Sequence, residues 1–400
     1  MDALMLPSNW QRVRLGDIAE IIGGGTPSTQ ITSFWNGSIN WFTATEIGIT
    51  KYVYKSQRTI TPLGLKKSSA KLLPIGTILL TSRASIGDCA ILKMVATTNQ
   101  GFQSLIPLEK INNEFLYYLT LTLKNKLLEL ASGSTFLEVS PNKIKNLLIP
   151  LPPLNEQIAI ANILSGLDRY LCALDALILK KEGVKKALSF ELLSQRKRLK
   201  GFNQNWQKVR LGTYKYRRGS FPQPYGNPQW YSDNGMPFVQ VYDVGENFKL
   251  TQKTKQKISK IAQPMSVFVP KNSVIITLQG TIGRVALTQY DCYCDRTILI
   301  FDNNTLNDVN KYFFVLSLFT KFEEEKRKAD GSIIKTITKQ TLKDFEILLP
   351  PLDEQIAIAN ILSDVDSEII SLKNKKRQFE NIKKALNHDL MSTKIRVLKK

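Results

Sequence analysis

The sequence predicts an α+β protein in which two α+β globular domains with pseudo-twofold symmetry are joined by two long antiparallel coiled-coil helices. Three observations predict this fold. The 400-residue chain contains an internal repeat that divides it into two equivalent halves. Each half ends in a proline-free segment whose apolar residues recur at helical spacing. The remainder of each half has the pattern of short strands, loops and short helices.

The repeat is strongest in residues 151–168 and 349–366, LPPLNEQIAIANILSGLD and LPPLDEQIAIANILSDVD, which are identical at fifteen of eighteen positions. A second match opens each half, where residues 9–16 read NWQRVRLG and residues 205–212 read NWQKVRLG. The segments between these blocks agree only at scattered points. One part of the repeated unit has therefore kept a shared role while the other part has diverged. The predicted parts are two globular domains, 1–150 and 201–348, and two helical segments, 151–200 and 349–400.

The globular domains are expected to be rich in strands. Residues 72–81 and 267–277 read as short strands about a turn, because β-branched and leucine residues surround a proline or glycine. The glycine- and proline-containing segments 23–27 and 219–226 are expected to be loops. Each domain should then continue into a helical stretch before its conserved block.

The conserved blocks predict the long helices. Each follows two prolines, which cannot continue an upstream helix, and Asn155 and Asp353 stand where an N-cap is expected. Glu156 and Glu354 follow in the first turn, where the helix dipole favours negative charge. Apolar residues then recur at alternating three- and four-residue steps, which is the seam of a coiled coil. Equal halves that pack as in a two-fold dimer would place the two helices antiparallel.

The first turns of both helices are apolar on nearly all sides, which predicts a second partner surface. The residues expected to bind that partner are Ile158, Ile160, Ile163, Ile356, Ile358 and Ile361. The alternative is that each helix folds back on its own globular domain.

The charge balance indicates a polyanionic partner. Lysine and arginine number 55 against 34 acidic residues, a net charge of +21, and nucleic acid is the usual partner of so basic a globular protein. A merely basic soluble protein is the alternative. No apolar stretch reaches the roughly 18 residues of a spanning helix, and the start is not a signal peptide, so no membrane contact and a cytoplasmic location are expected.

No catalytic set is found in the sequence. There is one histidine, His388, expected on the surface of the last helix, and the four scattered cysteines predict neither a disulfide framework nor a zinc site. No phosphate-binding or dinucleotide-binding loop occurs. The chain is therefore expected to be no enzyme and to have no catalytic or metal-binding residues.

The diverged segments are expected to contact DNA. Base edges are read by arginine, lysine, asparagine, glutamine, serine or threonine side chains on a rigid support. The candidates are Thr81, Ser82, Arg83, Asn99, Gln100 and Gln103 in the first domain and Arg217, Arg218, Gln223, Gln240, Gln279, Arg284 and Arg296 in the second. Trp35, Trp41, Tyr225 and Trp230 are candidates for packing on sugars or bases, and the lysines of 249–260 for phosphate contacts. A solvated or structural role is the alternative for each.

The order variable–conserved–variable–conserved, with LPPL-x-EQ-x-x-IA-x-IL opening both conserved segments, resembles the specificity (S) subunits of type I restriction–modification systems. The two NWQ-x-VRLG blocks and Thr81-Ser82-Arg83-Ala84-x-Ile86-Gly87 are also similar to that family, and the resemblance covers essentially the whole chain. It implies two target recognition domains, each reading one half of an asymmetric bipartite site in double-stranded DNA. It also implies an antiparallel coiled coil that spaces these domains.

The resemblance further implies partners. Two methyltransferase subunits would dock on the coil and methylate flipped adenines, and restriction subunits would join them. S-adenosylmethionine, ATP and Mg²⁺ would then be bound by partner subunits and no cofactor by this chain. Two alternatives stay open: a specificity subunit that serves a fused methylase–nuclease, and a stand-alone DNA-binding regulator.

Overall fold

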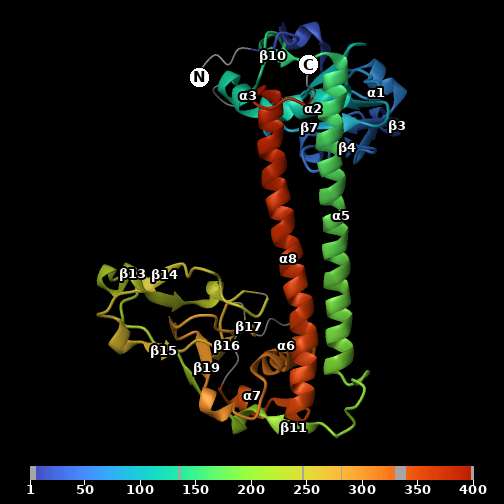
Figure 1. Ribbon diagram of the computed structural model, residues 1–400. Coiled ribbons are helices and arrows are strands. Elements are labelled where there is room, and N and C mark those ends of the chain that lie inside the picture. The colour runs from blue at the N-terminus through green and yellow to red at the C-terminus, as the bar shows by residue number, and fades with distance from the viewer. Residues whose placement is uncertain (1–5, 134–136, 246, 281, 329–338, 398–400) are drawn as a thin grey trace. The chain divides into compact units, whose positions relative to one another are not determined.

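The computed structural model describes residues 6–133, 137–245, 247–280, 282–328 and 339–397 (Figure 1). The chain forms two compact units, one drawn from residues 1–177 and 372–400 and the other from residues 178–371. Each unit therefore contains one globular domain together with a stretch of each long helix.

The globular part of the first unit contains a five-stranded sheet, a three-stranded sheet and a two-stranded ribbon. The five-stranded sheet has the order β2 (Ala19–Gly23), β9 (Gln103–Pro107), β6 (Ile78–Leu80), β7 (Cys89–Leu92), β4 (Tyr52–Val53). The three-stranded sheet has the order β5 (Arg58–Ile60), β3 (Trp35–Phe42), β8 (Ala96–Thr98), and β1 (Gln11–Arg14) pairs with β10 (Leu148–Leu151). The helices are α1 (Pro62–Lys66), α2 (Asn113–Thr122), α3 (Lys124–Leu130) and α4 (Pro141–Lys145).

Strand alternation explains why the five-stranded sheet is buried on both faces. Ile78 and Leu80 point to the core that α2 covers, while Leu79 between them joins the core on the other face. The larger of these two cores also holds Leu164 of the long helix that follows β10. The sheet thus supports the helix on one side and the three-stranded sheet region on the other.

The globular part of the second unit follows the same plan. One sheet has the order β12 (Tyr216–Arg218), β19 (Ile298–Phe301), β16 (Val274–Thr277), β17 (Val285–Leu287). The other has the order β14 (Gln256–Ile258), β13 (Tyr231–Val239), β18 (Cys292–Cys294), β15 (Val267–Val269), and β11 (Gln207–Arg210) pairs with β20 (Glu346–Leu349). Helices α6 (Lys311–Lys328) and α7 (Lys339–Asp344) complete the domain.

Two 40-residue helices, α5 (Leu154–Leu193) and α8 (Leu352–Met391), form the predicted coil. In the first unit Asp175 pairs with Lys376 at 2.6 Å, and Asp168 pairs with Lys383. In the second unit Lys181 pairs with Glu368 at 2.8 Å, and Lys185 with Asp366 at 2.5 Å. Residue numbers rise along α5 as they fall along α8 in every pair, so the helices run antiparallel, and the predicted fold class is confirmed.

The predicted N-caps are wrong. The helices begin at Leu154 and Leu352, so Asn155 and Asp353 lie inside the first turn. Pro153 accepts the first backbone bond of α5, from Glu156 N at 3.0 Å. The prolines favour this early start because their fixed φ suits the first helical turn.

In the first unit, a buried glutamate ties the start of α5 to the segment before β1. Glu156 is 1% exposed, and its carboxylate accepts hydrogen bonds from Trp10 Nε1 at 3.1 Å and Asn9 Nδ2 at 3.3 Å. Arg396, which follows α8, places Nη2 at 3.4 Å from the same carboxylate. We call this arrangement the first glutamate clamp.

The second unit repeats the arrangement at the start of α8. Glu354, also 1% exposed, accepts from Trp206 Nε1 at 3.2 Å. Arg198, which follows α5, binds it through both oxygens, with Nη2 at 2.6 Å and Nε at 3.2 Å. This is the second glutamate clamp. The arginine of the first clamp makes one contact with the carboxylate rather than two, and Glu156 Oε1 and Arg396 Nε have no hydrogen-bond partner among the described residues.

The glutamine that follows each clamp residue serves the same junction. Gln157 Oε1 accepts from the backbone of Asn112 at 3.0 Å and its Nε2 donates to Pro152 O at 3.0 Å. Gln355 makes the matching bonds to Asn310 and Pro350. The repeated Glu-Gln pair is therefore a structural device that fixes each domain to its helix.

We expect Glu354→Ala to lower the free energy of unfolding of the second unit by about 3 kcal/mol, because it leaves Arg198 and Trp206 with unpaired donors in a buried site. Urea denaturation followed by circular dichroism measures the loss. Asp353→Ala is the matched control, and this exposed first-turn substitution should cost about 0.5 kcal/mol. Equal losses in the two variants would show that the clamp adds nothing beyond the helix dipole.

Candidate nucleic-acid interface

A glycine-containing loop packs on a strand-end turn at matching places in the two units. In the first unit, Gly25 N donates to Thr98 O at 2.9 Å, and a Cβ on Gly24 would lie 1.9 Å from Asn99 O. In the second unit, Gly219 N donates to Ile298 O at 2.9 Å, and a Cβ there would lie 2.2 Å from Cys294 O. Only glycine permits this close approach. We call these pairs the loop-and-turn sites: residues 24–31 with 99–102, and residues 219–227 with 295–297.

The first loop-and-turn site presents uncharged polar groups. Thr26 donates to the exposed Gln100 across the junction of loop and turn. Asn99 accepts from Gly101 N at 2.9 Å through its carbonyl oxygen, and no described residue accepts from its amide nitrogen. Amide groups held in this way can form the paired hydrogen bonds that select adenine in the major groove.

Two tryptophans hold the first loop rather than stack on DNA. Trp41 is 3% exposed and donates to Gly25 O at 2.8 Å, and Trp35 is 8% exposed and donates to Ser28 O at 3.0 Å. The expectation that they pack on sugar or bases is therefore wrong. The exposed Arg58, with its guanidinium 3.8 Å from the centroid of the Trp35 ring, lies beside them. Sequence reasoning missed Arg58, because no motif marks it.

The second loop-and-turn site presents a cation and a phenol. The guanidinium of Arg296, on the turn, lies 5.3 Å from the ring centroid of Tyr225, on the loop. Tyr225 donates to the buried Asp295 at 2.5 Å. Burial and this bond raise the pKa of Tyr225, so the phenol stays protonated at neutral pH. The structure thus brings two predicted DNA-binding residues, Tyr225 and Arg296, into one site.

The other candidates of the second unit have varied surroundings. Arg218 is exposed at the end of β12, directly before the loop, and Gln223 is exposed within the loop. Gln279 is exposed on another turn. Arg217 Nη2 donates to Phe268 O at 3.1 Å, and Arg284 Nη1 donates to Val244 O at 3.2 Å. Gln240 accepts from Tyr242, and the half-buried Trp230 has no partner for its indole nitrogen among the described residues.

Four candidates of the first unit face inward or form ion pairs. Thr81 is 1% exposed and donates to Ser85 O at 2.6 Å, and Ser82 is 1% exposed and donates to Gly101 O at 3.2 Å. Gln103 is also buried. Arg83 pairs with Glu138 at 2.7 Å. Thr81 and Ser82 were expected to read bases, and that expectation is wrong because burial and backbone hydrogen bonds occupy both hydroxyls.

The apolar helix starts are only partly exposed. Ile160 and Ile358 are each 1% exposed and lie in the cores of their own domains, so the expectation that they bind a partner is wrong. Ile158 and Ile163 are each 41% exposed and Ile356 is 38% exposed, whereas Ile361 is half-buried. The exposed set also includes Leu154 and Leu352, which the repeated LPPL motif supplies and which sequence reasoning did not single out.

The described residues show no group of three or more histidine, cysteine, aspartate or glutamate side chains that could hold a metal ion. His388 is exposed on α8, with Nδ1 at 3.2 Å from Asp389. Within the same part of the chain, no helix is both long and apolar enough to cross a bilayer.

Different polar groups at matching sites of two repeated domains are what a DNA-binding protein with two different sequence-reading domains requires. The comparisons with known proteins identify the family. The model of the type I restriction modification DNA specificity domain matches residues 7–182 and 203–381. The chain belongs to this family, and it is a non-catalytic specificity subunit with two target recognition domains.

Individual relatives agree with this membership. The type I restriction enzyme MjaIX specificity subunit of Methanocaldococcus jannaschii is 42% identical over 167 residues, which are 41% of this chain and 39% of that protein. The MjaVIII specificity subunit of the same organism is 24% identical over 99% of this chain and 95% of its own length. The crystal structure of a type I S subunit from M. genitalium has the same fold, with a TM-score of 0.59 at 17% identity over 97% of this chain and 98% of that one.

We expect Thr81→Val to lower stability by about 1 kcal/mol without changing the DNA sequence that is recognised, because the hydroxyl bonds only to the backbone of its own turn. Thermal denaturation and a map of methylated sites in the assembled complex measure the two effects. Gln100→Ala is the control and should show the reverse: an unchanged melting temperature and weaker recognition. If the methylated sequence changed in Thr81→Val, Thr81 would contact a base after all and this prediction would be wrong.

Proposed function

We propose that this chain directs a type I restriction–modification complex to an asymmetric bipartite site in double-stranded DNA, each loop-and-turn site reading one half. The observation that carries this proposal is the difference between two equivalent sites. The first offers Thr26, Asn99 and Gln100, and the second offers Tyr225 and Arg296. Asparagine and glutamine pair with adenine, whereas arginine pairs with guanine. Two unlike readers on one chain select two unlike half-sites.

We also propose that two methyltransferase subunits dock on the helix starts. Exposed leucine and isoleucine side chains recur at the start of both helices, at Leu154 and Ile158 and again at Leu352 and Ile356. The same surface present twice favours two copies of the same partner. Such a surface is unfavourable in water and disfavours the alternative of a stand-alone DNA-binding regulator.

The remaining parts of the proposal concern the partners. Restriction subunits join the methyltransferase subunits, and S-adenosylmethionine, ATP and Mg²⁺ are bound by these partners rather than by this chain. The complex acts on DNA in the cytoplasm. Exposed lysines of the second unit, Lys249, Lys253 and Lys260, supply phosphate contacts that position the domain without reading sequence. A specificity subunit for a fused methylase–nuclease remains the alternative.

Exchanging residues 17–145 for the corresponding segment of a relative should replace one half of the methylated sequence and leave the other half unchanged. The physical reason is that the first loop-and-turn site lies wholly within that segment. Single-molecule sequencing of adenine methylation in cells that carry the chain and its partners gives the readout. A swap that leaves the methylated sequence intact would contradict the proposal.

Arg296→Ala should weaken recognition of one half-site by about 1–3 kcal/mol, roughly five- to 150-fold, and relax the preference at one base pair. Competition binding of the assembled complex to duplexes that vary at one position measures this change. Arg327→Ala, which removes an exposed arginine of α6, is the control and should leave the base preference unchanged. An equal, sequence-independent loss in both variants would assign Arg296 to the phosphate backbone.

A further inference from the structure

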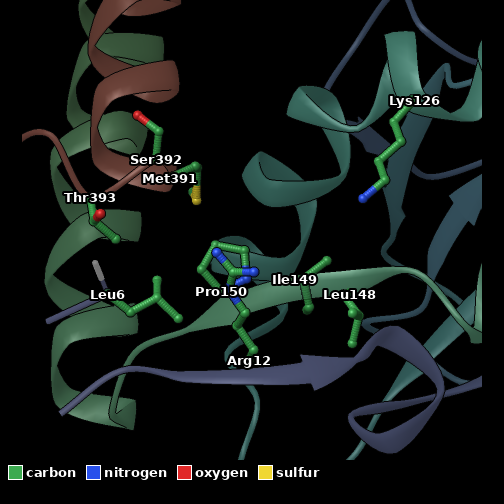
Figure 2. Close-up of a pocket in the computed structure, with 9 residues that line it drawn as sticks. All are labelled: Leu6, Arg12, Lys126, Leu148, Ile149, Pro150, Met391, Ser392 and Thr393. Carbon is green, nitrogen blue, oxygen red and sulfur yellow. The ribbon is translucent and has the colours of Figure 1, made fainter. Parts of the chain in front are cut away.

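An exposed leucine in the first unit lies between two neighbouring cavities. Leu148, at the start of β10, is 54% exposed. A cavity of about 360 Å³ lies against it, lined also by Arg12, Lys126 and Met391 (Figure 2). A second cavity, of about 400 Å³, is lined by Leu148, Lys126 and Lys143. Because both cavities share Leu148 and Lys126, they form one continuous surface, which we call the Leu148 groove.

The Leu148 groove combines an apolar floor with basic side chains. Leu148, Ile149, Pro150 and Met391 line the first of its two cavities, as Figure 2 shows. Among the residues that the structure describes, no carboxylate side chain lines either cavity. Arg12 and Lys126 form no ion pair with any described residue, and Figure 2 shows them reaching the cavity from β1 and α3. Such a surface is complementary to an acidic chain that carries apolar side chains.

The matching strand of the second unit lacks this character. In the first ribbon Leu148 lies opposite Arg14, whereas in the second ribbon Glu346 lies opposite Arg210. Arg210 Nε donates to Glu346 at 3.3 Å, so the second ribbon has an acidic residue where the first has an exposed leucine. An acidic ligand would meet a like charge there. The two units therefore differ at this position, although their two-stranded ribbons pair in the same way.

We propose that the Leu148 groove docks one acidic segment of a partner protein, which packs an apolar side chain against Leu148 and sets its carboxylates near Arg12 and Lys126. The apolar helix starts occur in both units, whereas the second unit has Glu346 at the position that matches Leu148, so we expect the partner to bind once per chain. DNA phosphates would match the cations and gain nothing from the apolar floor, which favours a peptide. The inference rests on the proposed assembly with partner subunits, because that assembly supplies such a segment.

The test uses the full chain and a short fluorescein-labelled peptide of glutamate and leucine, with binding followed by fluorescence anisotropy. We expect Leu148→Glu, which installs the residue type of the second unit, and Lys126→Glu each to weaken binding by about tenfold. Leu72→Glu and Lys66→Glu are matched controls, since Leu72 is 50% exposed, Lys66 lies on α1, and neither lines the groove. These controls should bind the peptide like the unaltered chain.

Three outcomes would overturn the proposal. One is equal weakening by the control variants, and another is equal binding of a glutamate–serine peptide; each would show general attraction to a basic protein. The third is displacement of the peptide by duplex DNA that depends on Leu148, which would make the groove a DNA surface. The methylation map of Leu148→Glu in the assembled complex separates this result from the proposed function, because that map should be unchanged.

Discussion

The structure depends on a buried carboxylate at the start of each long helix. A glutamate carboxylate that is 1% exposed is stable only if hydrogen-bond donors surround it, and Trp10 and Trp206 each supply one donor in their respective units. Each carboxylate joins three segments: the one before the first strand, the start of one helix, and an arginine beyond the end of the other helix. The clamp thereby fixes each domain to its coil, which explains why the repeat is best preserved in these segments.

The residues that fix each domain to its helix are different from the residues that are proposed to contact DNA. Each clamp pairs its glutamate with a tryptophan and an arginine, and the glutamines beside them bond to matching residues in both units. The loop-and-turn sites instead place an amide in one unit and a guanidinium in the other. A base-reading surface carried on a turn can change its exposed side chains without disturbing a core, because the loop is held by backbone hydrogen bonds from Gly25 and Gly219. The two-stranded ribbons also differ, because Leu148 in the first unit corresponds to Glu346 in the second.

The sequence predicted the fold because its strongest signals, an internal repeat and an apolar heptad pattern, act over long stretches of chain. Tyr225 and Arg296 were predicted as DNA-binding residues from their side-chain chemistry alone, and the structure places them next to each other. Burial was harder to predict: Thr81 has the side chain of a base reader, but its hydroxyl bonds to its own backbone. The charged residues Glu156 and Glu354 were assigned only to the first turn of each helix, and nothing local reveals that a distant tryptophan helps to bury them.

The first unit is built from two distant stretches of chain, and this order matters during synthesis on the ribosome. Its core contains Leu390 and Met391 beside Leu164, and its clamp uses Arg396. All of residues 178–371, which form the second unit, must emerge before these residues can arrive. Until then the nascent first domain exposes the seam of α5 to water, the kind of surface that chaperones bind. The domain made first is thus the last to be completed.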